Sequence, residues 1–299
     1  MIHTHGKGPG LYGRLLGWML GIPVVHTFHG FQHKLLPVVQ RWFYLFVENV
    51  LTLLTRHHIF VGNGEKNKAK VLMFLNDSNS SVVNNGIDLD SIQALPPAEE
   101  VLASLKLGPR ESIKIFGTLS RVSPEKGLDI LLEGFVEAAK RAPYIRLLVI
   151  GDCPGEHEKY IKMITQYIHE NGLDDAVKIL GAREDALEIL KSIDFYISPS
   201  RSEGLPYNLL EALAVGKPVM ATDIPGNNDI IRKSVEGILV PVNSARTLAH
   251  GILTLLELGP EEQKAMRQNG KVRIRDEFSL NIMSEKTFSI YKKVLEGVI

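Results

Sequence analysis

The sequence has few of the features that mark secreted, membrane-spanning or nucleic-acid-binding proteins. It holds one cysteine in 299 residues, Cys153, which excludes an intramolecular disulfide and is typical of a reducing compartment. The 34 basic and 34 acidic residues cancel, so we expect no nucleic-acid partner. The N-terminal residues lack the basic start and the apolar run of a secretory signal. These absences predict a cytoplasmic protein.

Several catalytic signatures are also missing. No Gly-x4-Gly-Lys-Ser/Thr loop is present, which excludes a P-loop, and no Gly-x-Ser-x-Gly elbow supports Ser/His/Asp chemistry. Seven of the ten histidines fall within residues 3–58. The spacing of His26, His29 and His33 invites a zinc interpretation, but no cysteine or nearby carboxylate completes a ligand set, so we expect no metal.

No apolar run is long and clean enough to cross a membrane. The longest, residues 35–54, is interrupted by polar residues and by Pro37. Arg41, Glu48 and Thr52 share one helical face and leave a wide apolar remainder. We favour a helix packed on a sheet. The alternative is contact with a membrane surface through residues 35–54. Basic residues that would support this contact are Lys34, Arg56, Lys66, Lys68 and Lys70.

Apolar runs alternate with helical patterns along the chain, which predicts parallel sheets in an α/β fold. Before a linker near Leu95-Pro96-Pro97, the expected strands are 1–4, 22–27, 58–62 and 81–84. After it, the expected strands are 113–119, 145–150, 177–180, 194–198, 218–221 and 237–240. The expected helices in this second part are 127–140, 156–170, 184–192 and 206–214, and a last helix covers about 280–295.

The segment 199–212 carries two glutamates, Glu203 and Glu211, eight positions apart. Pro206 falls where a helix should begin, and Gly204 before it allows a ligand to approach the backbone closely. The unpaired N–H groups and the positive dipole end at such a helix start bind anions, most naturally a phosphate.

The spacing of the two glutamates bears on their chemistry. Eight helical residues rise about 12 Å, whereas the two carboxylates of a glycosidase lie roughly 5 to 9.5 Å apart. The pair is therefore better placed to hold two ends of one long ligand, such as a sugar and a ribose joined by a diphosphate. The plainer alternative is two solvated glutamates near a helix start.

A second charged segment lies upstream. The strand 113–119 runs into the loop 120–127, which carries Arg121 and Lys126 and precedes a helix. Such a loop is the usual place for the phosphates of a nucleotide in an α/β sheet. Arginine offers a bidentate fork and lysine a point charge. Taken alone, both could be ordinary solvated loop charges.

Together these segments resemble the family 4 glycosyltransferases, whose GT-B fold has two Rossmann-like parallel-sheet domains that face a cleft. The resemblance covers essentially the whole chain. The matching pieces are 117–127, 148–152, 179–181, 194–211 and 216–223, and 84–88 resembles the stretch that closes the first domain. Two departures stand out: Cys153 takes a place often held by glycine, and Asn227 follows Gly226 where a second glycine is common.

The resemblance implies roles for four catalytic residues. Arg121 and Lys126 would bind the donor diphosphate, and Glu203 would contact the donor sugar. His29 matches a histidine that reaches the reacting sugar from the first domain. Such enzymes usually transfer with retention of anomeric configuration and need no metal.

Further residues would form the donor site. Gly204 and Leu205 would lend backbone N–H groups to sugar and phosphate, and Glu211 would hold the ribose hydroxyls. Gly181 and Pro206 complete the expected donor-binding set. The donor is expected to be a nucleotide-diphosphate sugar, UDP-linked, with no separate cofactor.

The resemblance also assigns domains. Residues 1–95 would form the acceptor-side domain, 96–279 the nucleotide-sugar domain, and 280–299 a helix that crosses back to the first domain. The opening residues 2–5 read as the end of a strand. We therefore expect an incomplete first domain with an open sheet edge, little activity of this chain alone, and a partner segment that completes it.

The implied activity is transfer of a sugar to a glycan or lipid-linked saccharide in surface polysaccharide biosynthesis, at the inner membrane face. Three alternatives stay open. A nucleotide-sugar epimerase would convert the donor without an acceptor, and a sugar phosphorylase would need pyridoxal phosphate on a lysine. A non-catalytic nucleotide-sugar-binding chain would instead complete another chain.

Overall fold

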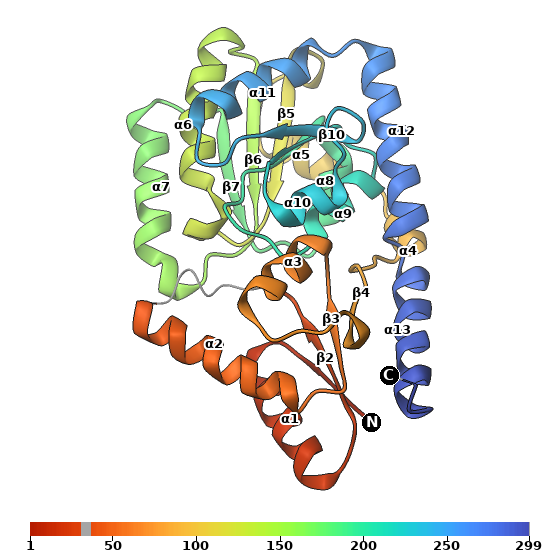
Figure 1. The fold of residues 1–299 in the computed structure, drawn as a ribbon. Coiled ribbons are helices and arrows are strands. Elements are labelled where there is room, and N and C mark those ends of the chain that lie inside the picture. Colours follow the sequence, from red (N-terminus) through yellow and green to blue (C-terminus); the bar gives the residue numbers. More distant parts are fainter. Residues whose placement is uncertain (31–36, 299) are drawn as a thin grey trace. The chain divides into compact units, whose positions relative to one another are not determined.

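The computed structural model describes residues 1–30 and 37–298, which form two compact α/β units (Figure 1). Unit 1 comprises Met1–Ile87, Glu203–Pro206 and Glu277–Ile299. Unit 2 comprises Asp88–Ser202 and Tyr207–Asp276. Each unit has its own parallel sheet, as the alternation of apolar runs and helical patterns predicts.

The sheet of unit 1 has the strand order β1-β2-β3-β4 and is parallel throughout. Its strands are β1 (Ile2–His5), β2 (Val24–Phe28), β3 (His57–Phe60) and β4 (Ser80–Val82), each within two residues of its predicted range. The helices are α1 (Lys7–Leu20), α2 (Val38–Leu53), α3 (Asn63–Leu72) and α13 (Leu280–Leu295), with a 3-10 turn at Asp77–Asn79. Ile290 and Val294 of α13 pack with Val25, Ile59 and Val83 in a buried cluster.

Helix α1 lies unusually close to the sheet because its inner face consists of glycines. A Cβ atom on Gly13 would come within 2.3 Å of the Thr4 side chain on β1. One on Gly17 would come within 2.1 Å of the Val24 side chain on β2. The bulky residues of α1 are thereby placed on its other faces.

Helix α2 buries a face that mixes apolar and polar residues, which differs from the arrangement that we favoured. A helix packed on a sheet should bury its apolar side, yet α2 buries Glu48 and Thr52 beside Leu45 and Leu51, and it exposes Trp42 and Phe46. The physical reason is Arg14 of α1, whose fully buried guanidinium donates to the Glu48 carboxylate at 2.9 Å. Pairing offsets the cost of removing both charges from water. Leu35, which we expected in this helix, lies outside the described residues.

The sheet of unit 2 is also parallel and has the order β10-β9-β8-β5-β6-β7. Its strands are β5 (Lys114–Leu119), β6 (Ile145–Ile150), β7 (Val177–Gly181), β8 (Phe195–Ser198), β9 (Val219–Thr222) and β10 (Gly237–Val240). The helices are α4 (Leu89–Ala94), α5 (Glu99–Ser104), α6 (Leu128–Arg141), α7 (Glu158–Glu170), α8 (Ala186–Ser192), α9 (Tyr207–Ala214), α10 (Pro225–Ile230), α11 (Ala245–Glu257) and α12 (Pro260–Glu277). Short 3-10 turns cover Arg110–Ser112, Pro124–Lys126 and Gly155–His157.

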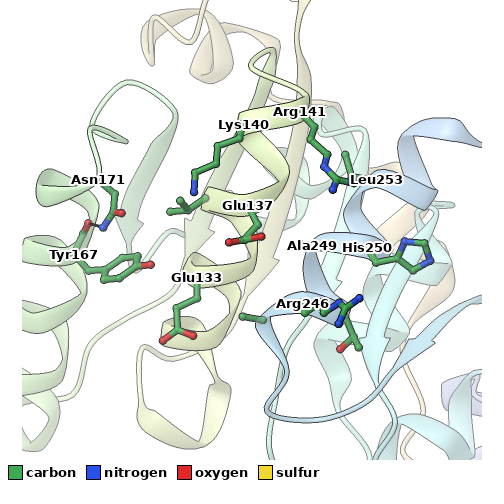
Figure 2. A pocket seen from close by; sticks show the side chains of 13 residues that line it. Glu133, Glu137, Lys140, Arg141, Tyr167, Asn171, Arg246, Ala249, His250 and Leu253 are labelled. Atoms are coloured by element: carbon green, nitrogen blue, oxygen red, sulfur yellow. Dashed lines mark hydrogen bonds between the residues drawn. The ribbon is translucent and has the colours of Figure 1, made fainter.

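One wide groove of about 920 Å³ lies among α6, α7 and α11 (Figure 2). Its lining mixes acidic residues of α6, such as Glu133 and Glu137, with Arg246 and His250 of α11. None of the site residues predicted from the sequence lines this groove.

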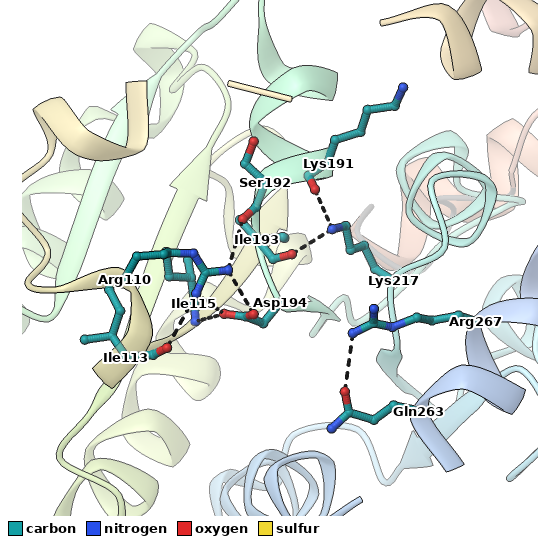
Figure 3. A network of polar contacts seen from close by, with 10 residues as sticks. All are labelled: Arg110, Ile113, Ile115, Lys191, Ser192, Ile193, Asp194, Lys217, Gln263 and Arg267. Atoms are coloured by element: carbon teal, nitrogen blue, oxygen red, sulfur yellow. Dashed lines mark hydrogen bonds and ion pairs between the residues drawn. The ribbon is translucent and has the colours of Figure 1, made fainter. Parts of the chain in front are cut away.

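A polar network fixes the amino-terminal ends of β5 and β8 (Figure 3). Arg110 donates two hydrogen bonds to the Asp194 carboxylate, at 3.0 and 2.9 Å, and the Ile115 backbone N–H donates to the same group at 2.8 Å. Lys217, just before β9, donates to the carbonyls of Lys191 and Ile193. These contacts hold the strands in register from the end opposite to the loop that carries Arg121.

Candidate active site

The loop after β5 is built by close backbone packing at the carboxyl end of the unit 2 sheet. Gly127, with φ of 68°, precedes α6, and a Cβ there would lie 2.3 Å from the Pro199 carbonyl oxygen. Gly151, with φ of 141°, follows β6, and a Cβ there would lie 2.0 Å from the Ser120 carbonyl oxygen. Only glycine permits both contacts. The loops after β5, β6 and β8 therefore touch one another at the carboxyl ends of these strands. In α/β proteins, this is the edge of the sheet where nucleotides bind.

This loop brings Arg121 and Lys126 together, as the sequence predicts for two residues of one phosphate-binding loop. Arg121 is exposed, and Lys126 is half-buried at the end of the 3-10 turn. Both line one small pocket of unit 2. The other lining residues are Thr118, Ser120, Val122, Leu128, Val149 and Pro199. The two cations thus border the same small crevice at the carboxyl end of β5, where fixed positive charge would attract an anion.

An ion pair that the sequence analysis did not identify clamps this loop. Arg201 donates to both oxygens of Asp129 on α6, at 2.8 and 2.7 Å, and its backbone N–H donates to the Glu125 carbonyl at 2.8 Å. Tyr160 donates to Asp129 at 2.8 Å. Burial acts to raise the pKa of Asp129, but the hydrogen bonds from Arg201 and Tyr160 outweigh it and the pKa is lowered. The only signal in the sequence was that Arg201 lies two residues before Glu203.

Two further residues of the predicted donor site lie in unit 2. Gly181 ends β7 with φ of 69°, and its carbonyl accepts from the Gly151 N–H at 2.8 Å. Glu211 is half-buried on α9, and burial raises the pKa of its carboxyl group. A carboxylate held partly out of water is well suited to accept hydrogen bonds from sugar hydroxyls.

The remaining predicted residues lie in unit 1. Glu203, Gly204, Leu205 and Pro206 form its inserted segment, and Pro206 directly precedes α9. A Cβ on Gly204 would lie 2.3 Å from the His29 carbonyl oxygen, so these backbones touch. The structure therefore brings His29 and the 203–206 segment together in unit 1, and Arg121 and Lys126 together in unit 2.

His29 has a partner that the sequence analysis did not single out. Its Nε2 lies 2.9 Å from Nδ1 of His5 at the end of β1. Burial lowers the pKa of both rings, and His5 adds to the shift of His29. When both rings are neutral, one nitrogen must donate and the other accept, so the tautomers of His5 and His29 are coupled.

The other histidines and the two departures from the family pattern have structural explanations. His26 and His58 are buried in β2 and β3. Residues 1–30 and 37–298 contain no group of three or more His, Cys, Asp or Glu side chains placed to bind a metal ion, and His33 lies outside them. Asn227 is fully buried and donates to the Thr222 carbonyl at 2.9 Å. Cys153 is half-buried in the loop after β6.

The two parallel-sheet units define an α/β protein of the GT-B type. Residues 104–273 match the family model "Glycosyl transferases group 1", and residues 1–91 match "Glycosyltransferase Family 4". The first match covers more than half of the sequence, and the chain belongs to the group 1 glycosyltransferases.

Curated relatives and solved structures agree with this assignment. The chain is 28% identical to the Escherichia coli UDP-Gal:alpha-D-GlcNAc-diphosphoundecaprenol alpha-1,3-galactosyltransferase, over 98% of this chain and 73% of that enzyme. It is 23% identical to the lipopolysaccharide core mannosyltransferase LpsB of Rhizobium meliloti, over 73% of this chain and 62% of that enzyme. The crystal structure of Anabaena Alr3699/HepE with UDP superposes with a TM-score of 0.85 at 20% identity, over 97% of this chain and 78% of that one.

The chain is shorter than the relatives that it matches, since it spans 73% and 62% of the lengths of the two enzymes. The length and polarity of its helices decide whether one of them could cross a membrane. Among the described residues, every helix is too short or too polar to cross a bilayer.

Proposed function

We propose that this chain transfers a sugar from a nucleotide-diphosphate sugar, UDP-linked, to a saccharide acceptor. The observation that carries the proposal is the loop of unit 2 that places Arg121 and Lys126 beside one another at the carboxyl end of β5. Fixed cations beside a leaving diphosphate stabilise the charge that develops as the sugar departs. Two supporting facts are the name of the E. coli relative, which specifies a UDP-galactose donor, and the UDP in the Anabaena structure.

The proposed reaction proceeds with retention. The acceptor hydroxyl oxygen forms a bond to the anomeric carbon on the face from which the diphosphate leaves, as the bond between that carbon and the phosphate oxygen breaks. The hydroxyl proton passes to the departing phosphate. Arg121 and Lys126 carry the charge of the leaving group, and we propose that no metal is needed.

The two glutamates take different parts in this proposal. Glu211, half-buried on α9, holds the ribose hydroxyls. Glu203 and the backbone of Gly204 and Leu205 bind the sugar and its phosphate. His29, whose Nε2 lies 2.9 Å from Nδ1 of His5, reaches the transferred sugar. Pro206 and Gly181 shape the backbone around the donor.

The proposed acceptor is a lipid-linked saccharide of surface polysaccharide assembly, at the cytoplasmic face of a membrane. Support comes from the E. coli relative, whose name specifies a GlcNAc-diphosphoundecaprenol acceptor.

The test is product analysis by NMR. Purified chain, UDP-galactose and a GlcNAc-diphospholipid are combined with and without EDTA, and the coupling of the new anomeric proton is read. We expect this chain alone to have little activity, but the product that it does form from the α-linked donor should be α-linked and should be formed equally with EDTA. A β-linked product would refute retention, and loss of product with EDTA would refute the metal-free mechanism. Conversion of the donor without acceptor would favour an epimerase instead.

A further inference from the structure

Arg201 joins several loops at the carboxyl end of the unit 2 sheet. It follows β8, and its side chain is half-buried beside the loop 120–127. The guanidinium donates four hydrogen bonds within unit 2, to the carboxylate of Asp129, the carbonyl of Pro124 and the side chain of Asn243. Each guanidinium nitrogen therefore already has a partner in the protein.

These contacts join segments that are distant in the sequence. Pro124 lies in the 3-10 turn before α6, Asp129 in the first turn of α6, and Asn243 between β10 and α11. The Asp129 carboxylate also accepts from Tyr160 of α7 at 2.8 Å, and its backbone N–H donates to the same hydroxyl at 3.1 Å. The loops after β5, β8 and β10 and the start of α7 are thereby tied to one another.

Arg201 also holds the turn that places Lys126. Its side chain donates to the Pro124 carbonyl, and its backbone N–H donates to the Glu125 carbonyl at 2.8 Å. Both acceptors belong to the 3-10 turn that Lys126 ends. Gly127, which follows, is packed against the carbonyl oxygen two residues before Arg201. The segment that ends at Arg201 therefore holds the backbone on both sides of Lys126.

A loop that binds an anion gains affinity when its cations are held in place beforehand, because less conformational freedom is then lost on binding. We propose that Arg201 is a positioning residue, which fixes the loop 120–127 for an anionic ligand that it does not touch. Asp129 in turn fixes the guanidinium. This inference rests on the proposed function, in which Arg121 and Lys126 of this loop bind the diphosphate of UDP.

The charge of Asp129 provides a test whose sign separates positioning from plain electrostatics. A carboxylate near a diphosphate repels it, so electrostatics alone predicts that Asp129→Asn strengthens UDP binding. Positioning predicts weaker binding, because an amide cannot offer two charged acceptor oxygens to the guanidinium. We expect Asp129→Asn and Arg201→Ala each to weaken the affinity for UDP roughly five- to tenfold in calorimetry, which is less than the loss of one cation.

A lysine at position 201 separates the shape of the side chain from its charge. Arg201→Lys keeps the positive charge but loses the planar fork that pairs with Asp129. We expect this variant to bind UDP as weakly as Arg201→Ala. A cation that contacted the diphosphate directly would be replaced at least in part by lysine.

A double-mutant cycle identifies the route of the effect. Because Arg201 acts through the turn that places Lys126, Arg201→Ala should change the affinity for UDP about twofold or less when Lys126→Ala is already present. If Arg201 contacted the ligand by itself, the two losses would multiply.

The matched control is the Arg110–Asp194 ion pair of the same unit (Figure 3). This pair is also bidentate, at 3.0 and 2.9 Å, and it lies at the opposite end of β5 from the loop 120–127. Arg110→Ala and Asp194→Asn should lower the midpoint of thermal unfolding but leave the affinity for UDP unchanged. If Arg201 had only a structural role, Arg201→Ala would give the same result as these controls.

Hydrogen exchange tests the positioning without a ligand. The backbone N–H groups of Lys126 and Gly127 donate within the turn, at 3.0 and 3.2 Å. In Arg201→Ala these two amides should exchange faster than in the wild type, because the turn opens more often. In Arg110→Ala they should exchange at the wild-type rate.

The outcomes separate this inference from the proposed function. Positioning fails alone if Lys126→Ala weakens UDP binding while Arg201→Ala and Asp129→Asn do not. It also fails if Asp129→Asn binds UDP more tightly, or if the turn amides exchange equally in all variants. A wild-type chain that does not bind UDP, or a Lys126→Ala variant with unchanged affinity, contradicts the proposed function and this inference with it.

Discussion

Acidification should unfold unit 1 through its buried histidines. Burial, with the charge of Arg14 adding to it, lowers the pKa of His26 to about 2 and that of His58 to about 3. In the unfolded chain both titrate near 6.5. Below that pH the unfolded state binds protons that the folded state does not, so the free energy of unfolding falls as the pH drops. Above pH 6.5 both histidines are neutral in the folded and in the unfolded state, so they no longer change the free energy of unfolding with pH.

The magnitude follows from proton linkage. Each histidine removes about 1.4 kcal/mol per pH unit between its unfolded and folded pKa values. From pH 6.5 to 5, His26 and His58 together should therefore remove about 4 kcal/mol. That loss is a large part of the roughly 5 to 15 kcal/mol that is typical of a folded domain.

Urea unfolding followed by tryptophan emission measures this loss, because Trp18 and Trp42 both lie in unit 1. The midpoint should fall markedly between pH 7.5 and pH 5. His26→Asn removes one titrating group, so its pH dependence should be shallower by about 2 kcal/mol, whatever its absolute stability. His250→Gln, an exposed histidine of unit 2, is the control. A midpoint that does not depend on pH, or an unchanged slope in His26→Asn, would show that these histidines do not control acid stability.

Three further predictions concern single residues. Gly127→Ala places a Cβ on a left-handed backbone and against a carbonyl oxygen, and should lower the free energy of unfolding by roughly 1 to 2 kcal/mol or more. Gly155→Ala, whose Cβ would meet open space, should not lower it, and thermal unfolding compares the two variants. Glu211→Gln should weaken UDP binding, whereas Glu203→Gln should slow transfer while UDP still binds; equal loss of UDP binding in calorimetry would contradict the division. Glu48→Gln leaves a buried guanidinium without its charge partner and should cost roughly 3 kcal/mol in urea unfolding, and an unchanged midpoint would argue against the pair.

The sequence predicted those features that depend on local pattern. Alternating apolar runs located the strands of both sheets, and the last helix was placed at 280–295, as observed. Arg121 and Lys126 were singled out as candidates because one strand-to-helix loop contains both. Features that join distant residues escaped prediction, because no periodicity links them.

Two such features shape unit 1 and the loop that carries Arg121. The orientation of α2 depends on Arg14, which lies 34 positions before Glu48. The clamp on the loop that carries Arg121 joins Arg201 to Asp129 across 72 positions. In both cases no local pattern in the sequence links the two partners, and only the fold brings them together.

The most direct test of the proposed function is calorimetric titration of the chain with UDP. We expect binding that Arg121→Ala and Lys126→Ala each weaken roughly tenfold or more, the cost of one lost hydrogen bond to a charged group. Arg183→Ala and Lys159→Ala, two cations of unit 2 outside the pocket, should bind UDP like the wild type. Equal affinity in all four variants, or no UDP binding by the wild-type chain, would contradict the assignment of this pocket to the donor diphosphate.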